Sequence, residues 1–103
     1  MIKKIDFETA HILMGEKDNK IILDVREEEE YITGHAVDAQ LFPVDSINEV
    51  SAREIIPDKS SAIFVYCRSG RRSKMAAEKL EECGYKEIYD LGGLIGWPYG
   101  LEV

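Results

Sequence analysis

The sequence predicts an α/β fold in which helices cover a parallel sheet. Short runs rich in β-branched and other apolar residues alternate with helical stretches of about ten residues, which is typical of repeated strand–helix–strand units. The two central runs, Lys20–Val25 and Ala62–Tyr66, are nearly all apolar, as expected of strands buried on both faces. A chain of 103 residues is expected to form one domain, over residues 1–103, whose core needs neither metal nor disulfide.

The predicted elements follow one another with short connections. The five strands are Ile2–Ile5, Lys20–Val25, Gln40–Pro43, Ala62–Tyr66 and Glu87–Tyr89. The helices run from an Asp6 cap through Met14, from Asp45 or Ser46 to about Ile55, and from about Arg71 to Glu82, with a short helical turn over Glu27–Ile32. Gly84 supplies the left-handed residue that commonly follows a helix.

Charge and composition exclude several classes of partner and site. The formal net charge of −7 opposes binding to nucleic acid and to anionic membranes. The longest apolar run, Ala62–Cys67, is far shorter than the roughly 20 residues of a membrane helix, and no secretory signal is visible, so we expect a soluble protein of the cytoplasm. Two cysteines and two scattered histidines suit neither a disulfide scaffold nor a metal site, and we expect no metal and no cofactor.

Three segments end or follow predicted strands, where open α/β sheets bind their ligands. They are Asp24-Val25-Arg26, the run from Cys67 to Ser73, and Gly92-Gly93. Because the carboxyl ends of parallel strands share one edge of a sheet, chemistry is expected there.

The run after the fourth strand combines a cysteine with positive charge. Residues 68–74 hold four cations and no acid: Arg68, Arg71, Arg72 and Lys74. This local sequence predicts a basic pocket on an acidic protein. A loop with Gly70 leads into a helix, and helix N-termini and neighbouring arginines lower a cysteine's pKa, so Cys67 is predicted to be a reactive thiolate. Cys83 lies on one helical face with Ala76 and Leu80 and is predicted to be a core residue.

Three ordered motifs resemble those of the rhodanese-like sulfurtransferases, specifically the small single-domain kind. They are Ile22-Leu23-Asp24-Val25-Arg26 followed by Glu29-Glu30-Tyr31 and Gly34-His35; the run from Val65 to Ser73; and Leu91-Gly92-Gly93 with Trp97. The resemblance implies a five-stranded parallel sheet flanked by helices on both faces, a persulfide carried by Cys67, and loop amides from Arg68 to Arg72 around the transferred sulfur. Thiosulfate is that family's usual donor in vitro. The chain departs from the family at Ala36-Val37-Asp38-Ala39, where Ile-Pro-Gly-Ala is common, so the turn before the third strand is expected to differ.

The residues suggest a coherent reaction. The Cys67 thiolate attacks the outer sulfur of a small anionic donor and sulfite leaves. The persulfide then passes its terminal sulfur to a thiol or protein acceptor. The predicted substrate-binding residues are Arg68, Ser69, Gly70, Arg71 and Arg72, with Arg72 the favoured ligand of the donor's oxyanion.

Other polar and aromatic residues are predicted to support the fold. Asp24 and Arg26 are expected to brace the strand end rather than transfer protons. The acidic run Glu27–Glu30 is expected to be a solvated helix start, and His35 a structural residue. Trp97 is predicted to pack in the core, with a place in the wall of the Cys67 pocket as the alternative.

Two other functions remain open on the sequence. A cysteine-dependent phosphatase or arsenate reductase would also hold a thiolate in a cationic loop, but the arginine expected six residues after the cysteine is Ser73 here. A non-catalytic rhodanese-like binding or regulatory module is the second alternative. The intact cysteine and basic loop favour catalysis over it.

Overall fold

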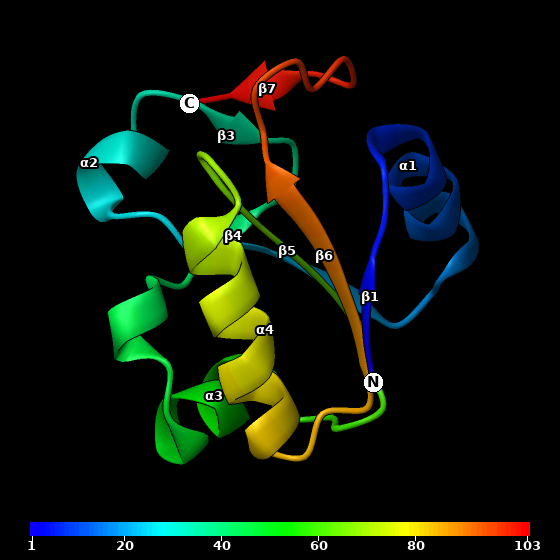
Figure 1. Ribbon diagram of the computed structural model, residues 1–103, viewed down its shortest axis with the longest axis vertical. Helices are drawn as coiled ribbons and strands as arrows, with labels where there is room; N and C mark the ends of the chain where they lie inside the picture. The colour runs from blue at the N-terminus through cyan, green and yellow to red at the C-terminus, as the bar shows by residue number, and fades with distance from the viewer.

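The computed structural model describes residues 1–103 and is built around a parallel sheet of five strands with the order β1-β6-β5-β2-β4 (Figure 1). The strands are β1 (Ile2–Lys4), β2 (Lys20–Asp24), β4 (Gln40–Leu41), β5 (Ala62–Cys67) and β6 (Glu87–Gly93). All neighbouring strands in this sheet run parallel, so the predicted architecture is confirmed.

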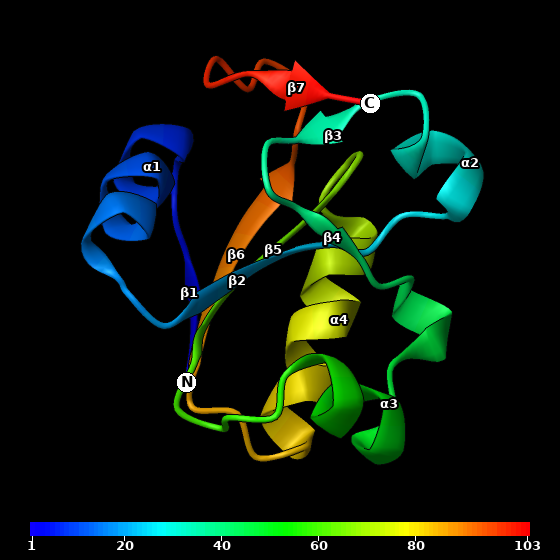
Figure 2. The same cartoon turned by 180° about the vertical axis from the view of Figure 1, so that it is seen from behind.

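Helices cover both faces of the sheet, as Figures 1 and 2 show. Helix α1 (Phe7–Glu16) lies on one face, and α3 (Glu49–Ile55) and α4 (Arg71–Glu82) lie on the other. A single short turn of helix, α2 (Glu28–Tyr31), lies beyond the end of β2. No helix combines the length and the apolar character needed to cross a membrane.

Successive residues of β5 point into two separate hydrophobic cores. Ile63, Val65 and Cys67 pack with residues of α3 and α4, whereas Phe64 and Tyr66 pack with residues of α1. This alternation follows from the two-residue period of a strand. It directs the side chain of Cys67 toward the helix that begins four residues later.

The helix ends agree with their capping residues. The Asp6 carboxylate accepts a hydrogen bond from the Thr9 amide at 2.8 Å, which confirms this residue as the cap of α1. Hydrogen bonding to Thr9, through its side chain first and its amide second, lowers the pKa of Asp6. Helix α4 spans the predicted range, and Gly84 follows its last turn with a φ of +97°. Glu27 and Glu30 form a capping box at α2.

Three details differ from the prediction. The segment expected to form one helix from Asp45 or Ser46 is a 3-10 helix, η1 (Val44–Ser46), followed by α3, because the Asn48 side chain caps the Ser51 amide and starts a new helix. Strand β6 continues through Gly92 and Gly93 rather than ending at Tyr89, after an irregularity in its pairing with β5. A second sheet pairs β3 (His35–Ala36) with β7 (Leu101–Glu102) in antiparallel fashion.

Candidate active site

Cys67 is the last residue of the central strand and is completely buried. It lies opposite Gly93 of β6, and its carbonyl accepts a hydrogen bond from the Leu94 amide at 3.0 Å. The end of β5 is therefore held by main-chain contacts on the side of β6. These contacts fix the backbone from which the thiol projects.

The loop after Cys67 folds back over the sulfur. The Gly70 amide lies 2.9 Å from Cys67 Sγ and donates a hydrogen bond to it. Gly70 has a φ of +96°, a conformation that a side chain resists. Its carbonyl in turn accepts from the Ser73 hydroxyl at 3.1 Å, which ties the loop to the first turn of α4. One amide of the predicted sulfur-binding loop, that of Gly70, thus contacts Sγ.

Gly93 presses against this loop from β6. A Cβ at residue 93 would lie 2.2 Å from the carbonyl oxygen of Arg68 and 3.1 Å from Cα of Ser69. Both neighbours are main-chain atoms, so nothing can move aside cheaply. Gly93 is therefore required by the close approach of two backbones, and Gly92 by its φ of +75°.

The four cations of the loop divide into two groups. Arg68, Arg71 and Lys74 are exposed and form no ion pair. Arg72 instead binds Glu30 of α2 through both terminal nitrogens, with Nη1–Oε1 and Nη2–Oε2 distances of 2.6 and 3.0 Å. The hydrogen bonds from Arg72 lower the pKa of Glu30 to about 2, and the same carboxylate raises the pKa of Arg72. The role of Arg72 as donor ligand stays a prediction, whereas the prediction of a merely solvated Glu30 is wrong.

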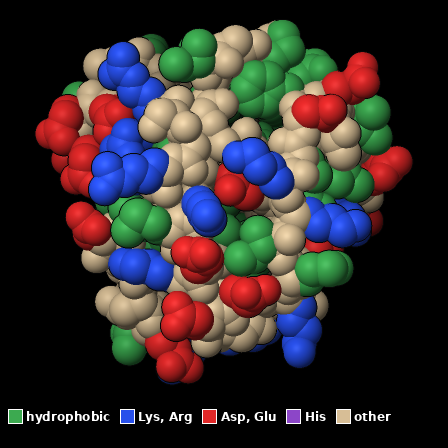
Figure 3. All heavy atoms as spheres, viewed as in Figure 1, with side chains coloured by type: hydrophobic (Ala, Val, Ile, Leu, Met, Phe, Trp, Pro, Cys, Tyr) green, Lys and Arg blue, Asp and Glu red, His purple; other side chains and the backbone are tan.

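Two clefts flank the Cys67 loop, and both contain acids as well as cations. A cleft of about 340 Å³ is lined by Arg68 and, from other parts of the chain, by Glu29, Leu94, Ile95 and Leu101. A cleft of about 370 Å³ on the other side is lined by Arg71 and Ser69 together with Glu27 and Asp45. Figure 3 shows side chains of both charges crowded over α2 and the start of α4. The prediction of a basic pocket is wrong in this respect, because α2 brings carboxylates to the loop.

Asp24 and Arg26 form a buried network beside the site. Arg26 donates to both oxygens of Asp24, with Nη2–Oδ2 at 2.6 Å, and its Nη2 also donates to the Gly34 carbonyl at 2.8 Å. The Tyr66 hydroxyl donates to Asp24 at 2.7 Å and accepts from the Ala36 amide at 3.1 Å. Burial raises the pKa of Tyr66, and the hydrogen bond to Asp24 raises that of Arg26. These contacts are those of a brace at the strand end.

The remaining predicted residues lie away from Sγ. His35 is buried, stacks on Tyr31 and has Nδ1 3.0 Å from the Tyr31 carbonyl, so it supports the framework. Cys83 is half-buried against the core that contains α4. Neither residue contacts the Cys67 loop through a hydrogen bond.

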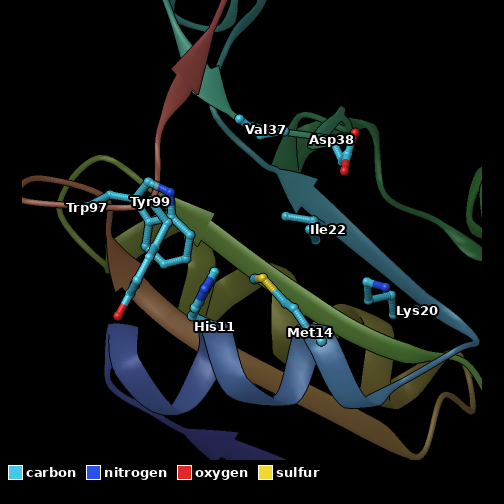
Figure 4. Close-up of a pocket in the computed structure, with 9 residues that line it drawn as sticks. His11, Met14, Lys20, Ile22, Val37, Asp38, Trp97 and Tyr99 are labelled. Atoms are coloured by element: carbon cyan, nitrogen blue, oxygen red, sulfur yellow. The ribbon is translucent and has the colours of Figure 1, made fainter.

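Trp97 lies in a different part of the molecule from the Cys67 loop. It packs edge-on against Phe7 and Tyr99, and it lines a cavity of about 310 Å³ beside α1 (Figure 4). His11 stacks on Tyr99 in the same cavity, with ring centroids 3.8 Å apart. Packing in the core is therefore the correct interpretation of Trp97. The buried indole N–H has no hydrogen-bond partner.

Comparison with known proteins identifies the family. The sequence profile of the rhodanese-like domain matches residues 7–98. This chain belongs to the rhodanese-like family. The match includes α1, the Cys67 loop and Gly92-Gly93, and so confirms the resemblance carried by the three motifs.

Named relatives and solved rhodanese structures agree with this identification. Thiosulfate sulfurtransferase PspE of Escherichia coli is 39% identical over 72 residues, which are 70% of this chain and 68% of PspE. Thiosulfate sulfurtransferase GlpE of Coxiella burnetii is 34% identical over 98 residues, covering 94% of this chain and 88% of GlpE. A structure described as rhodanese with anions from E. coli superposes with a TM-score of 0.74 at 31% identity, over 81% of this chain and 96% of that one. The solution structure of a rhodanese-like domain from Anabaena gives a TM-score of 0.83 at 25% identity, over 99% and 80%. The protein is a rhodanese-type sulfurtransferase.

Replacing Glu30 by Gln should remove an acid-sensitive part of this rhodanese's stability. Because the pKa of Glu30 is depressed in the folded protein, its contribution is complete above its ordinary pKa of 4.5 and is lost as pH falls toward about 2. The difference in unfolding free energy between the wild type and Glu30→Gln should therefore shrink with acidification, as measured by urea unfolding. Glu28→Gln, at an exposed neighbour without an ion pair, is the control. A pH-independent difference for Glu30→Gln would contradict the proposed link to Arg72.

Replacing Gly93 by Ala should disturb the rhodanese loop as well as the fold. The added Cβ meets the Arg68 carbonyl, and we expect a cost of about 1–3 kcal/mol in unfolding free energy. The rate of Cys67 alkylation by iodoacetamide should change as the loop shifts. Gly15→Ala is the matched control, since Gly15 lies exposed in α1 with no atom within 4 Å of its Cβ position, and there a stabilisation of roughly 0.5–1 kcal/mol is expected. Equal effects of the two variants would exclude the steric explanation.

Proposed function

We propose that this rhodanese transfers sulfane sulfur from thiosulfate, or from a persulfide donor, to a thiophilic acceptor through a persulfide on Cys67. The observation that carries the proposal is the hydrogen bond from the Gly70 amide to Cys67 Sγ at 2.9 Å, beneath a loop with free arginines. A hydrogen-bond donor that points at the sulfur stabilises the thiolate and the persulfide anion alike. The relatives PspE and GlpE, both named thiosulfate sulfurtransferases, support thiosulfate as the donor.

Sulfur transfer is a sequence of two displacements. The Cys67 thiolate attacks the outer sulfur of thiosulfate, the sulfur–sulfur bond of thiosulfate breaks, and sulfite leaves with the bonding electron pair. A thiolate acceptor then attacks the terminal sulfur of the persulfide, and Cys67 leaves as a thiolate. No net oxidant or reductant is consumed, and Cys67 ends the cycle in the state in which it began.

The donor reaches Cys67 when the side chains of Arg68 and Ser69 move aside. Cys67 is completely buried, so its sulfur is closed to a donor in the resting conformation. Arg68 and Ser69 are exposed and their side chains form no hydrogen bond within the protein. These side chains are free to move, while the backbone of the loop is held by Gly93, by Ser73 and by the pair formed by Arg72 and Glu30.

The arginines of the loop perform different tasks. Arg68 and Arg71 are unpaired and capture the dianionic donor by charge. Arg72 is engaged by Glu30 and holds the start of α4 against α2. Asp24 and Arg26 brace the neighbouring strand end, while Ser69 and the amides from Arg68 to Arg72 line the path of the sulfur. The rhodanese structure from E. coli described with anions is consistent with such capture.

Phosphoryl chemistry suits this loop poorly. Ser73, at the position where a cysteine phosphatase carries arginine, is buried and donates to the Gly70 carbonyl. The residue therefore builds the loop and offers no charge to a transferred phosphoryl group.

The proposal also covers the domain that acts and the cellular compartment in which it acts. Residues 1–103 act as a single rhodanese-like domain, with every proposed functional residue on one set of loops at the ends of β2, β5 and β6. Both cysteines are free, which suits the reducing conditions of the cytoplasm.

Substituting Cys67 by Ser should abolish sulfur uptake and leave the fold intact. Incubation with thiosulfate followed by intact-mass measurement should show one added, reductant-labile sulfur in the wild type and none in Cys67→Ser. Cys83→Ser should load normally, because Cys83 packs against the core of α3 and α4. A folded wild type that never loads would favour a non-catalytic module, and hydrolysis of an aryl phosphate that depends on Cys67 would favour a phosphatase.

Neutralising Arg68 should weaken donor capture more than neutralising Arg72. We expect Arg68→Ala to raise KM for thiosulfate by roughly tenfold with a smaller change in kcat, since its attraction precedes the transition state. Added salt should raise KM of the wild type as well, because the unpaired guanidinium is screened over about 8–10 Å. Steady-state kinetics against ionic strength provide the measurement. A larger rise in KM for Arg72→Ala than for Arg68→Ala would show that Arg72 is the ligand of the donor's oxyanion.

A further inference from the structure

The cleft beside the Cys67 loop has an exposed aliphatic wall. Leu94, Ile95 and Leu101 line it together with Arg68. The side chains of Ile95 and Leu101 are 79% and 60% exposed. The wall begins beside the backbone of Cys67, because the Leu94 amide donates a hydrogen bond to the Cys67 carbonyl. Large aliphatic side chains grouped at a reaction site indicate a surface that a partner covers.

A small anionic donor makes no use of this wall. Thiosulfate offers charged oxygens and a sulfur atom, which the unpaired Arg68 and Arg71 accommodate. An aliphatic surface stabilises a ligand in proportion to the apolar area that both remove from water. The molecule that uses Ile95 and Leu101 therefore carries apolar side chains of its own.

The charges in the cleft restrict which side chains a partner segment can carry. Arg68 is an unpaired cation next to the aliphatic wall, and Glu29 is an exposed acid on the α2 side. A segment with one acidic side chain can pair with Arg68, whereas a strongly acidic segment is repelled by Glu29 and by the net charge of −7. The complementary ligand is thus mostly apolar, with a single acid.

We infer that this cleft docks the sulfur acceptor, and that the acceptor is a protein whose cysteine lies on an extended segment between aliphatic side chains and close to one acidic residue. The inference rests on the proposed sulfur transfer through Cys67. It places donor capture on the loop cations and acceptor recognition on Leu94, Ile95 and Leu101. The acceptor's thiol attacks the terminal sulfur of the persulfide while the segment lies in the cleft beside Arg68.

Two synthetic peptides test the inference. In one peptide, a leucine stands on each side of a cysteine, and a glutamate precedes the first leucine. In the other peptide, serines replace both leucines. The wild type is first loaded with thiosulfate, and kcat/KM for sulfur transfer to each peptide is then measured. We expect a preference of about tenfold for the leucine peptide, equivalent to about 1.4 kcal/mol.

Substitutions in the aliphatic wall test whether the cleft causes the preference for the leucine peptide. Ile95→Ser and Leu101→Ser should each reduce the preference to less than about threefold, while loading by thiosulfate stays within about twofold of the wild type. Val50→Ser is the matched control, because Val50 is a 62% exposed aliphatic residue on α3, remote from the loop. It should keep the full preference.

The outcomes separate this inference from the proposed function. A loaded wild type that serves both peptides equally, or a preference that survives both wall variants, overturns the docking inference and leaves sulfur transfer intact. A concentration-dependent dimer that Ile95→Ser abolishes also overturns it, because a second copy of the chain then covers the wall. A wild type that never takes up sulfur overturns the proposed function itself, and the inference with it.

Discussion

The close approach of two backbones determines the geometry of the site. The end of β6 passes so near the loop after β5 that a Cβ at Gly93 would lie 2.2 Å from the Arg68 carbonyl oxygen. The same strand pairs Gly93 with Cys67 and is continued by the Leu94 amide, which binds the Cys67 carbonyl. Held in this way, the loop can turn only through a residue that tolerates a φ of +96°, and Gly70 places its amide on the sulfur. The position of the nucleophile is therefore set by main-chain contacts, with the Gly70 amide on its sulfur and the apolar core of α3 and α4 beneath it.

Charge at the site is shared between segments that are far apart in sequence. The loop supplies cations, but the short helix α2 brings carboxylates to both of its sides. The pair of Arg72 and Glu30 joins α4 to α2 and is fully ionised near neutral pH, since the pKa of Glu30 is about 2. Fixing one cation in this way leaves Arg68 and Arg71 as the charges available to a ligand. On a protein with a net charge of −7, the cations available at the site are therefore these two side chains beside several carboxylates, and there is no broad basic surface.

The sequence was sufficient to predict the five strands and α1 and α4, because their signals are local. Asp6 has the side chain of a cap, and Ala62–Cys67 is apolar throughout, as a strand buried on both faces must be. The extension of β6 is not predicted because two consecutive glycines are typical of a strand's end. Inside the strand, Gly93 is explained by the contact with Arg68 and Gly92 by its φ of +75°. The two-residue strands β3 and β7 are too short to leave a pattern.

The candidate site was predictable to a similar extent and for the same reason. Cys67 and its loop form one continuous motif, so the sequence places them together. Glu30 belongs to a run of four glutamates that looks like any solvated helix start, and nothing in that run indicates a bond to a residue 42 positions away. The aliphatic wall likewise joins Ile95 and Leu101 only through the folding of the C-terminal segment. Contacts of this kind depend on the tertiary structure and have no local signature.

Strand alternation explains why the two faces of the molecule have different roles. Tyr66 and Cys67 are consecutive, so their side chains point to opposite faces of the sheet. On the α1 face, Tyr66 is bound by Asp24 and by the Ala36 amide, which fixes the register of β5 against β2 at the end where the site lies. A slip of one residue would exchange the two faces and bury the thiol among the aromatic residues beside α1. The network around Asp24 thus determines which face carries the nucleophile, although none of its members touches the sulfur.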